Sequence, residues 1–129
     1  MNFFEKLSPY AGVFHGRGIN HEQQEFRGTL KLEPAVSGKG FQLLFTAACA
    51  KGEVFHDELT TLAPDLEGTP CLWNLNSNVP GLVRHALVAC EETEERLRAT
   101  FRYGDIAQEN SFREEIALDL WGNGDVSYT

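Results

Sequence analysis

The stretch Glu25-Phe26-Arg27-Gly28-Thr29-Leu30-Lys31-Leu32-Glu33 alternates without a break between polar residues and apolar residues or glycine. Because successive side chains of a β-strand point to opposite faces, the alternation predicts a strand with one buried face and one face in water. Residues 96–103 repeat the pattern with three arginines on the polar face. Residues 112–121 repeat it again, although the acid Glu114 falls on the apolar face. Such strands are typical of an antiparallel sheet with one buried side.

Turn sequences divide the rest of the chain into further strand-like segments, at residues 11–18, 41–50, 54–62, 71–77, 83–90 and 125–129. The strongest turn signals are Ala50-Lys51-Gly52, Gly104-Asp105 and Gly122-Asn123-Gly124-Asp125. Four prolines are expected to fall between strands, where a missing backbone N–H does no harm. They are Pro34, Pro64, Pro70 and Pro80.

Nine short strands joined by tight turns predict an all-β fold, an antiparallel up-and-down β-barrel with a short N-terminal helix. The helix is expected over residues 2–7, and residues 1–129 are expected to form a single domain. Closing the sheet into a barrel hides its apolar face and removes its edges. A two-sheet sandwich is the competing arrangement.

The chain is acidic, with 11 lysines and arginines against 19 aspartates and glutamates and a formal net charge of -8. This balance repels phosphate backbones, so no nucleic-acid partner is predicted. No apolar run reaches the roughly 20 residues that span a bilayer, and the first residues do not resemble a signal peptide. Cys49, Cys71 and Cys90 lie in apolar stretches without C-x-x-C spacing, which predicts buried free thiols. A cytoplasmic location is therefore expected.

The segment Gly12-Val13-Phe14-His15-Gly16-Arg17-Gly18 follows the predicted helix and opens the first strand. It resembles the G-x-W-x-G-x-G start of calycin-type (lipocalin-like) β-barrels, with Phe14 in place of the tryptophan. The segment Gly52-Glu53-Val54-Phe55-His56-Asp57-Glu58 is similar to the G-x-P-L-H-x-E segment of the nitrobindin-like family. The fatty-acid-binding-protein-like family is the other close likeness. The resemblance implies a barrel that holds a small ligand.

The same resemblance bears on cofactors. In haem-binding members of the nitrobindin-like family a histidine late in the chain ligates the iron. This chain has no histidine after His85, so haem is disfavoured, and no other cofactor is predicted.

Polar anchors for a ligand are expected on two strands. His56 and Glu58 are two residues apart and share one strand face, although the pattern does not decide whether that face is inward. His85 shares a face with Val83 and Leu87 and is expected to point inward. Solvent-exposed or internally bonded histidines would have the same spacings. No metal site is predicted, because no second close pair of ligands accompanies these residues.

Aromatic residues complete the predicted ligand-binding set, namely Phe14, Phe45, Trp73, Phe101 and Tyr103. Trp73 is expected in the core or at a pocket wall, because its large ring favours burial. The asparagines that alternate with it fit either a polar cavity wall or a solvent-facing strand. They are Asn74, Asn76 and Asn78.

The leading hypothesis is a non-catalytic protein that holds a small hydrophobic or amphipathic ligand, such as a lipid, a fatty acid or a tetrapyrrole, inside the barrel. Small residues beside the aromatic ones, Gly28, Ala47 and Ala99, would leave space for it. One alternative is a filled barrel that acts as a structural or protein-interaction module, with a homodimer as one form. The other is a small acid–base enzyme that uses His85 or Glu114, although no catalytic motif is present.

Overall fold

A computed structural model of the protein describes residues 2–19, 22–104 and 112–129. In these ranges α1 (Phe3–Leu7) and the 3-10 helix η1 (Ser8–Tyr10) precede nine strands. The strands are β1 (Gly12–Ile19), β2 (Glu25–Ala35), β3 (Gly40–Ala48), β4 (Val54–Pro64), β5 (Pro70–Asn76), β6 (Val83–Glu92), β7 (Arg96–Tyr103), β8 (Glu114–Trp121) and β9 (Val126–Tyr128).

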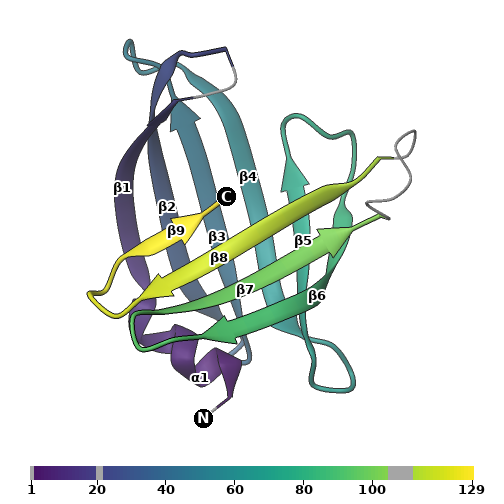
Figure 1. The fold of residues 1–129 in the computed structure, drawn as a ribbon. Coiled ribbons are helices and arrows are strands. Elements are labelled where there is room, and N and C mark those ends of the chain that lie inside the picture. The colour runs from purple at the N-terminus through teal and green to yellow at the C-terminus, as the bar shows by residue number, and fades with distance from the viewer. Residues whose placement is uncertain (1, 20–21, 105–111) are drawn as a thin grey trace.

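Each strand pairs with its neighbours in the chain, always antiparallel, in the order β1 to β9. The sheet curls round into a nearly closed barrel, so that β6 to β8 lie across from β1 to β4 (Figure 1). The edge strands β1 and β9 border a hollow of about 550 Å³, which is lined by Phe14 and His15 on one side and by the β8–β9 hairpin on the other. The predicted up-and-down barrel with a short helix is confirmed, and the two-sheet sandwich is wrong.

The alternation that predicted β2 is followed in the barrel. Leu30 and Leu32 are 6% and 1% exposed and face inward, opposite Phe45 and Leu43 of β3. The three arginines of β7 face outward, where Arg98 forms a bidentate pair with Asp119 of β8 at 2.7 and 2.9 Å. Such a pair fixes the register of the two strands on the solvent side.

The prolines and cysteines do not all lie where the sequence placed them. Pro34 lies inside β2, and Pro64 and Pro70 are the last residue of β4 and the first of β5. All three are close to a strand end, where the loss of one N–H donor removes little of the hydrogen-bond ladder. Cys71 is buried as predicted, whereas Cys49 is half-buried and Cys90 is exposed, and all three are free.

The apolar core fills the end of the barrel that the N-terminal helix closes. Leu7 of α1 is fully buried, and Phe4 stacks on Phe41 with ring centroids 6.4 Å apart. The buried cluster consists of Leu7, Leu30, Leu32, Phe41, Leu43, Leu62, Leu72, Leu97, Ala99, Phe101, Ile116, Leu118 and Leu120. Asn2 caps the helix by accepting a hydrogen bond from the Glu5 N–H at 2.9 Å. Neither helix in the described ranges is long and apolar enough to cross a membrane.

The turn between β8 and β9 determines where the last strand lies. Gly124 has a φ of 96°, a left-handed conformation that glycine adopts without strain. Asn123 accepts a hydrogen bond from the Asp125 N–H at 3.0 Å, which tightens the same turn. The predicted Asn-Gly hairpin is thus confirmed, and it turns the chain back so that Tyr128 pairs with Leu118.

Replacing Leu62 with alanine is expected to lower the free energy of unfolding by about 2–5 kcal/mol, because the change leaves a cavity in the core. Leu62 is 0% exposed, whereas Leu66, in the β4–β5 turn, is 108% exposed. The control Leu66→Ala is expected to change stability by less than about 0.5 kcal/mol. Urea unfolding followed by circular dichroism measures both. Equal losses in the two variants would contradict the position of Leu62 in the core.

Candidate functional site

Polar side chains collect inside the barrel at the end away from α1. They come from the first residues of β4, β6 and β8 and from the last residues of β5 and β9. Their members are His56, Glu58, Thr60, Asn74, Asn76, His85, Glu114 and Tyr128. Four of them, Thr60, Asn74, Asn76 and His85, are at most 8% exposed. Polar groups this deeply buried are stable only when they are hydrogen-bonded or paired, so the contacts of each group bear on its function.

Most of these groups form one continuous hydrogen-bond network. Asn76 donates to the Asn74 side-chain oxygen at 2.6 Å, and Asn74 donates to the Thr60 hydroxyl at 2.9 Å. The Thr60 hydroxyl lies 2.9 Å from the Tyr128 hydroxyl, and the Glu58 carboxyl group is close enough to Tyr128 to raise its pKa. We call this set, Glu58, Thr60, Asn74, Asn76 and Tyr128, the interior network. It ties β9 to β4 and β5 across the barrel.

His56 extends the interior network toward the barrel mouth. Its Nδ1 atom accepts a hydrogen bond from the Asn78 side-chain amide at 2.9 Å. Since an amide N–H₂ group only donates, the neutral His56 ring has its proton on Nε2. That atom lies 3.5 Å from a carboxyl oxygen of Glu58. The prediction that His56 and Glu58 share a face is confirmed, and the face is the inward one.

Burial raises the pKa of the Tyr128 phenol, and the nearby carboxyl group of Glu58 raises it further. Glu114 acts in the same direction more weakly. Both carboxyl groups therefore place negative potential at the Tyr128 hydroxyl. The phenol stays protonated, and remains a hydrogen-bond donor, well above neutral pH.

His85 and Glu114 form a second polar pair. Their Nε2 and Oε1 atoms are 2.8 Å apart, although the ring N–H is not aligned with the carboxyl oxygen as a hydrogen bond requires. The His85 side chain is fully buried, and its Nδ1 atom has no hydrogen-bond partner among the described residues. His85 points inward as predicted, and Glu114 joins it there. This pair is the incompletely bonded part of the interior.

A cavity of about 470 Å³ opens beside both polar groups. It is lined by residues 78–82 of the β5–β6 connection, by Val83 and Arg84 at the start of β6, by Tyr103 and by Phe112. Asn78 in its wall bonds to His56, and Tyr103 lies next to His85 with ring centroids 6.4 Å apart. Tyr103 also contacts Phe112 at 5.6 Å between ring centroids. We call this hollow the mouth cavity.

The structure places five residues of the predicted ligand-binding set in two contact groups, Phe45 with His56 and Glu58, and His85 with Tyr103. The Phe45 ring lies 6.1 Å from His56 and 5.9 Å from Tyr128, measured between ring centroids. Phe101 is inside too, but it is 0% exposed and belongs to the filled core. Phe14 lies apart from the others, at the hollow between the two edge strands.

The prediction that Trp73 lies in the core or at a pocket wall is wrong. Its ring is 40% exposed on the outer face of β5, because Leu72, Asn74 and Asn76 take the inward positions. Alternation makes the two faces exclusive, so the asparagines could enter the interior network only if Trp73 turned outward. Sequence reasoning left their face open and missed Thr60 and Tyr128 altogether. The spacing of the asparagines was the one signal available.

The sequence predicted space for a ligand beside the small inward residues Gly28, Ala47 and Ala99, but most of that space is filled. A Cβ atom on Gly28 would lie 3.2 Å from the Phe45 ring, and Ala47 and Ala99 are 3% and 0% exposed. Glycine at position 28 therefore makes room for an aromatic ring of the protein itself. Space for a ligand lies nearer the mouth than the sequence suggested.

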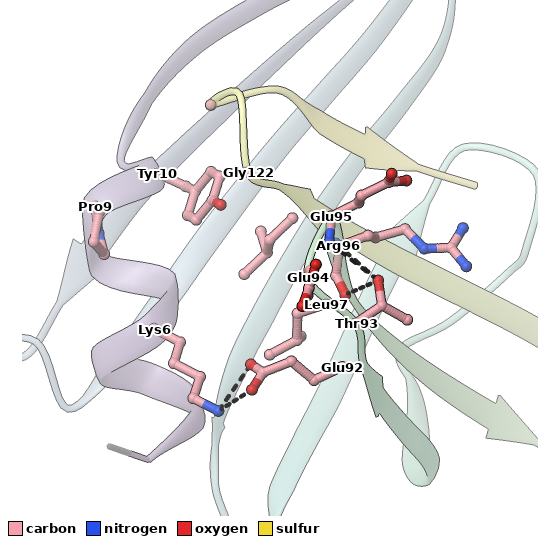
Figure 2. Close-up of a pocket in the computed structure, with 12 residues that line it drawn as sticks. Lys6, Pro9, Tyr10, Glu92, Thr93, Glu94, Glu95, Arg96, Leu97 and Gly122 are labelled. Carbon is pink, nitrogen blue, oxygen red and sulfur yellow. Dashed lines mark hydrogen bonds and ion pairs between the residues drawn. The ribbon is translucent and has the colours of Figure 1, made fainter.

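A further hollow of about 490 Å³ lies at the helix end, between η1 and the β6–β7 hairpin (Figure 2). Several of its polar side chains are bonded to each other or to the backbone. Lys6 pairs with Glu92 at 2.9 Å, and the Tyr10 hydroxyl donates to the Trp121 carbonyl oxygen at 2.7 Å. The unpaired buried polar atoms of the described residues lie instead at His85 and Glu114, and His85 lies beside Tyr103 of the mouth cavity, which is therefore the better candidate site.

Among the described residues, no three histidine, cysteine or acidic side chains gather closely enough to hold a metal ion. No protein-family model, curated protein or solved structure matches the chain. Function is therefore inferred from the barrel interior.

The stabilising effect of Tyr128 is expected to decline at alkaline pH. The folded protein holds the phenol proton more tightly than the unfolded chain does, so this contribution is complete below the ordinary tyrosine pKa and is lost above it. Between about pH 9 and about pH 11 the loss amounts to about 1.4 kcal/mol.

Tyr128→Phe removes this contribution. The difference in unfolding free energy between the wild type and Tyr128→Phe is expected to shrink over that range, as measured by urea unfolding at each pH. A difference that does not vary with pH would contradict the buried phenol.

Proposed function

We propose that the protein is a binding protein that holds a small hydrophobic or amphipathic molecule at the mouth of its barrel. The observation that supports this most is the contact of the mouth cavity with two inward histidines, through Asn78 to the half-buried His56 and through Tyr103 to the buried His85. Ligand sites are mostly apolar hollows with a few convergent polar groups, which fix the orientation of the ligand. The mouth cavity combines both features.

The fold supports the same proposal by analogy. A nearly closed antiparallel barrel with a short N-terminal helix is consistent with a calycin-like fold. We further propose a relationship to the nitrobindin-like and fatty-acid-binding-protein-like families, based on the Gly12–Gly18 and Gly52–Glu58 segments. Folds host many functions, so the residues of the site have more weight than this likeness. The cytoplasmic location and a homodimer stay predictions.

The filled-barrel alternative describes the half of the interior near α1. There the side chains of Leu7, Phe41, Phe101 and their neighbours pack against one another in one cluster. The other half contains buried polar groups that a purely structural barrel would lose little by replacing with well-packed apolar residues. Their presence supports a binding role for that half.

Proton transfer on a bound molecule is the second candidate function. The specific observation in its favour is the 2.8 Å approach of His85 Nε2 to Glu114 Oε1, since a carboxyl group can orient a histidine that acts as a base. For any ligand that the protein retains, loss of C–H protons to deuterated solvent would test it by NMR. An exchange that the protein accelerates and Glu114→Gln abolishes is expected of a base; an unchanged rate excludes it.

The binding proposal is tested with a small-molecule screen by thermal shift and native mass spectrometry, over fatty acids, alkyl alcohols, alkyl amines and haem. A retained ligand with a raised melting temperature is expected. For that ligand, Tyr103→Ala is expected to weaken binding by about tenfold, since it removes an aromatic wall of the mouth cavity.

Trp73→Ala is the matched control. Trp73 and Tyr103 are 40% and 43% exposed, but Trp73 lies on the outer face of the barrel. Its replacement is expected to leave the dissociation constant unchanged. Equal effects of the two replacements, or a screen without any retained ligand, would overturn the proposal.

A further inference from the structure

Strand β1 has a neighbouring strand on one side only. Residues 12–19 pair with residues 25–32 of β2 in an unbroken register, and β1 is the first strand in the sheet order. None of the other backbone hydrogen bonds within the described ranges involves these eight residues. Because an edge strand bonds to its neighbour with only part of its backbone, the remaining N–H and C=O groups of β1 form a row of unpaired donors and acceptors. We call this row the β1 edge.

The β1 edge is accessible to a further strand. Val13 and Ile19 are 55% and 65% exposed, and a Cβ atom on Gly16 would meet no atom within 4 Å. The strand β9, on the other side of the barrel opening, is three residues long. Natural sheets protect their edges with prolines and bulges, and residues 12–19 contain neither. A long, regular edge of this kind is a template for an extended segment of another chain.

The outer face of β1 carries a positive charge without an acidic partner. Arg17 lies directly opposite Arg27 of β2, and like charges in this position repel each other. Glu25 lines the same hollow of about 340 Å³ as the two arginines. Even so, neither arginine forms an ion pair with an acid in the described part of the chain.

Strand β7 shows how this sheet pairs outward arginines when a neighbouring strand is present. Arg98 lies opposite Asp119, with 2.7 Å between nitrogen and oxygen. Arg102 lies opposite Glu115, with a corresponding distance of 2.6 Å. In both pairs an acid on the next strand matches the arginine. By the same rule, an acid that matches Arg17 belongs on a strand beyond the β1 edge.

We propose that the β1 edge binds an extended acidic segment of a partner protein, which adds a strand to the sheet and places a carboxyl group beside Arg17. In this mode of recognition, backbone hydrogen bonds supply affinity and alternate side chains supply specificity. The residue next to that acid points inward beside Gly16, where there is room for an apolar side chain. The partner segment is therefore expected to alternate acidic and apolar residues.

The charge of β1 argues against a second copy of the chain as the occupant. Pairing of two β1 edges would bring Arg17 of one copy toward the arginines of the other, and like charges across strands are unfavourable. The proposed surface is also separate from the mouth cavity, whose lining contains no residue of β1. The inference therefore does not depend on the small-molecule binding proposed above.

The test uses three capped peptides of the same length as β1. The first alternates glutamate with valine, the second alternates lysine with valine, and the third is the glutamate peptide with its backbone amides methylated. Titration calorimetry on the full chain at neutral pH is expected to give the first peptide a dissociation constant at least about tenfold below those of the other two. Amide hydrogen exchange measured by NMR is expected to slow at residues 12–19 in that complex.

Arg17→Gln and Lys39→Gln provide a matched pair of variants. Both remove one positive charge from an exposed side chain, but Lys39 lies in the β2–β3 turn, at the opposite end of β2 from Arg27. Arg17→Gln is expected to weaken binding of the glutamate peptide by about three- to fivefold, and Lys39→Gln is expected to leave it unchanged. Because Arg17→Gln removes a repulsion, it is expected to fold at least as stably as the wild type.

Each way in which the proposal can fail gives a different result. Equally tight binding of the methylated peptide would mean that the two arginines attract any anion, and strand addition would be wrong. Equally tight binding of the lysine peptide, or equal losses in the two variants, would contradict an acidic partner. A free protein that sediments as a dimer, with slow exchange at residues 12–19, would assign the edge to a second copy instead. Absence of binding by the glutamate peptide would overturn the proposal and leave the mouth cavity unaffected.

Discussion

The interior of a small barrel has no room for water around every polar group, and this constraint governs the whole structure. Each strand places alternate side chains inside, so every inward polar atom needs a partner from another strand. The interior network meets this demand by joining Thr60, Asn74 and Tyr128 across 68 residues of chain. The short strand β9 is fixed in place by those bonds as well as by its pairing with β8.

The two halves of the interior follow different rules. Near α1 the inward residues are leucines and phenylalanines, and burial of their apolar area provides the stability of the fold. Toward the mouth the inward residues are polar and bonded to each other, which contributes little net stability but defines their orientation. A filled apolar core and a bonded polar interior therefore coexist in one barrel, because the rigid half holds the polar half in place.

Alternation and turn sequences together predicted the nine strands and the hairpin at Asn123, and alternation predicted the inward direction of His85. It could not decide which face of β5 points inward, because Trp73 and its neighbouring asparagines fit the same pattern in either direction. General propensity favours a buried tryptophan, and long-range bonding to Thr60 and Tyr128 overrides it. Local pattern contains no information on such partners, which is also why the position of Glu114 beside His85 was beyond its reach.

His85 shows how the incomplete part of the network differs from the rest. Replacing a buried, unpaired histidine with an apolar residue would relieve its desolvation cost, so the unpaired nitrogen is a local weakness of the free protein. Strained or unsatisfied groups persist where they serve binding, because the partner recovers the cost only in the complex. The recovered free energy then adds to affinity and selects ligands by the type of hydrogen bond they make. In this barrel the apolar half defines the shape, the bonded polar half fixes the geometry, and the His85 nitrogen is the inward group that the described residues leave without a partner.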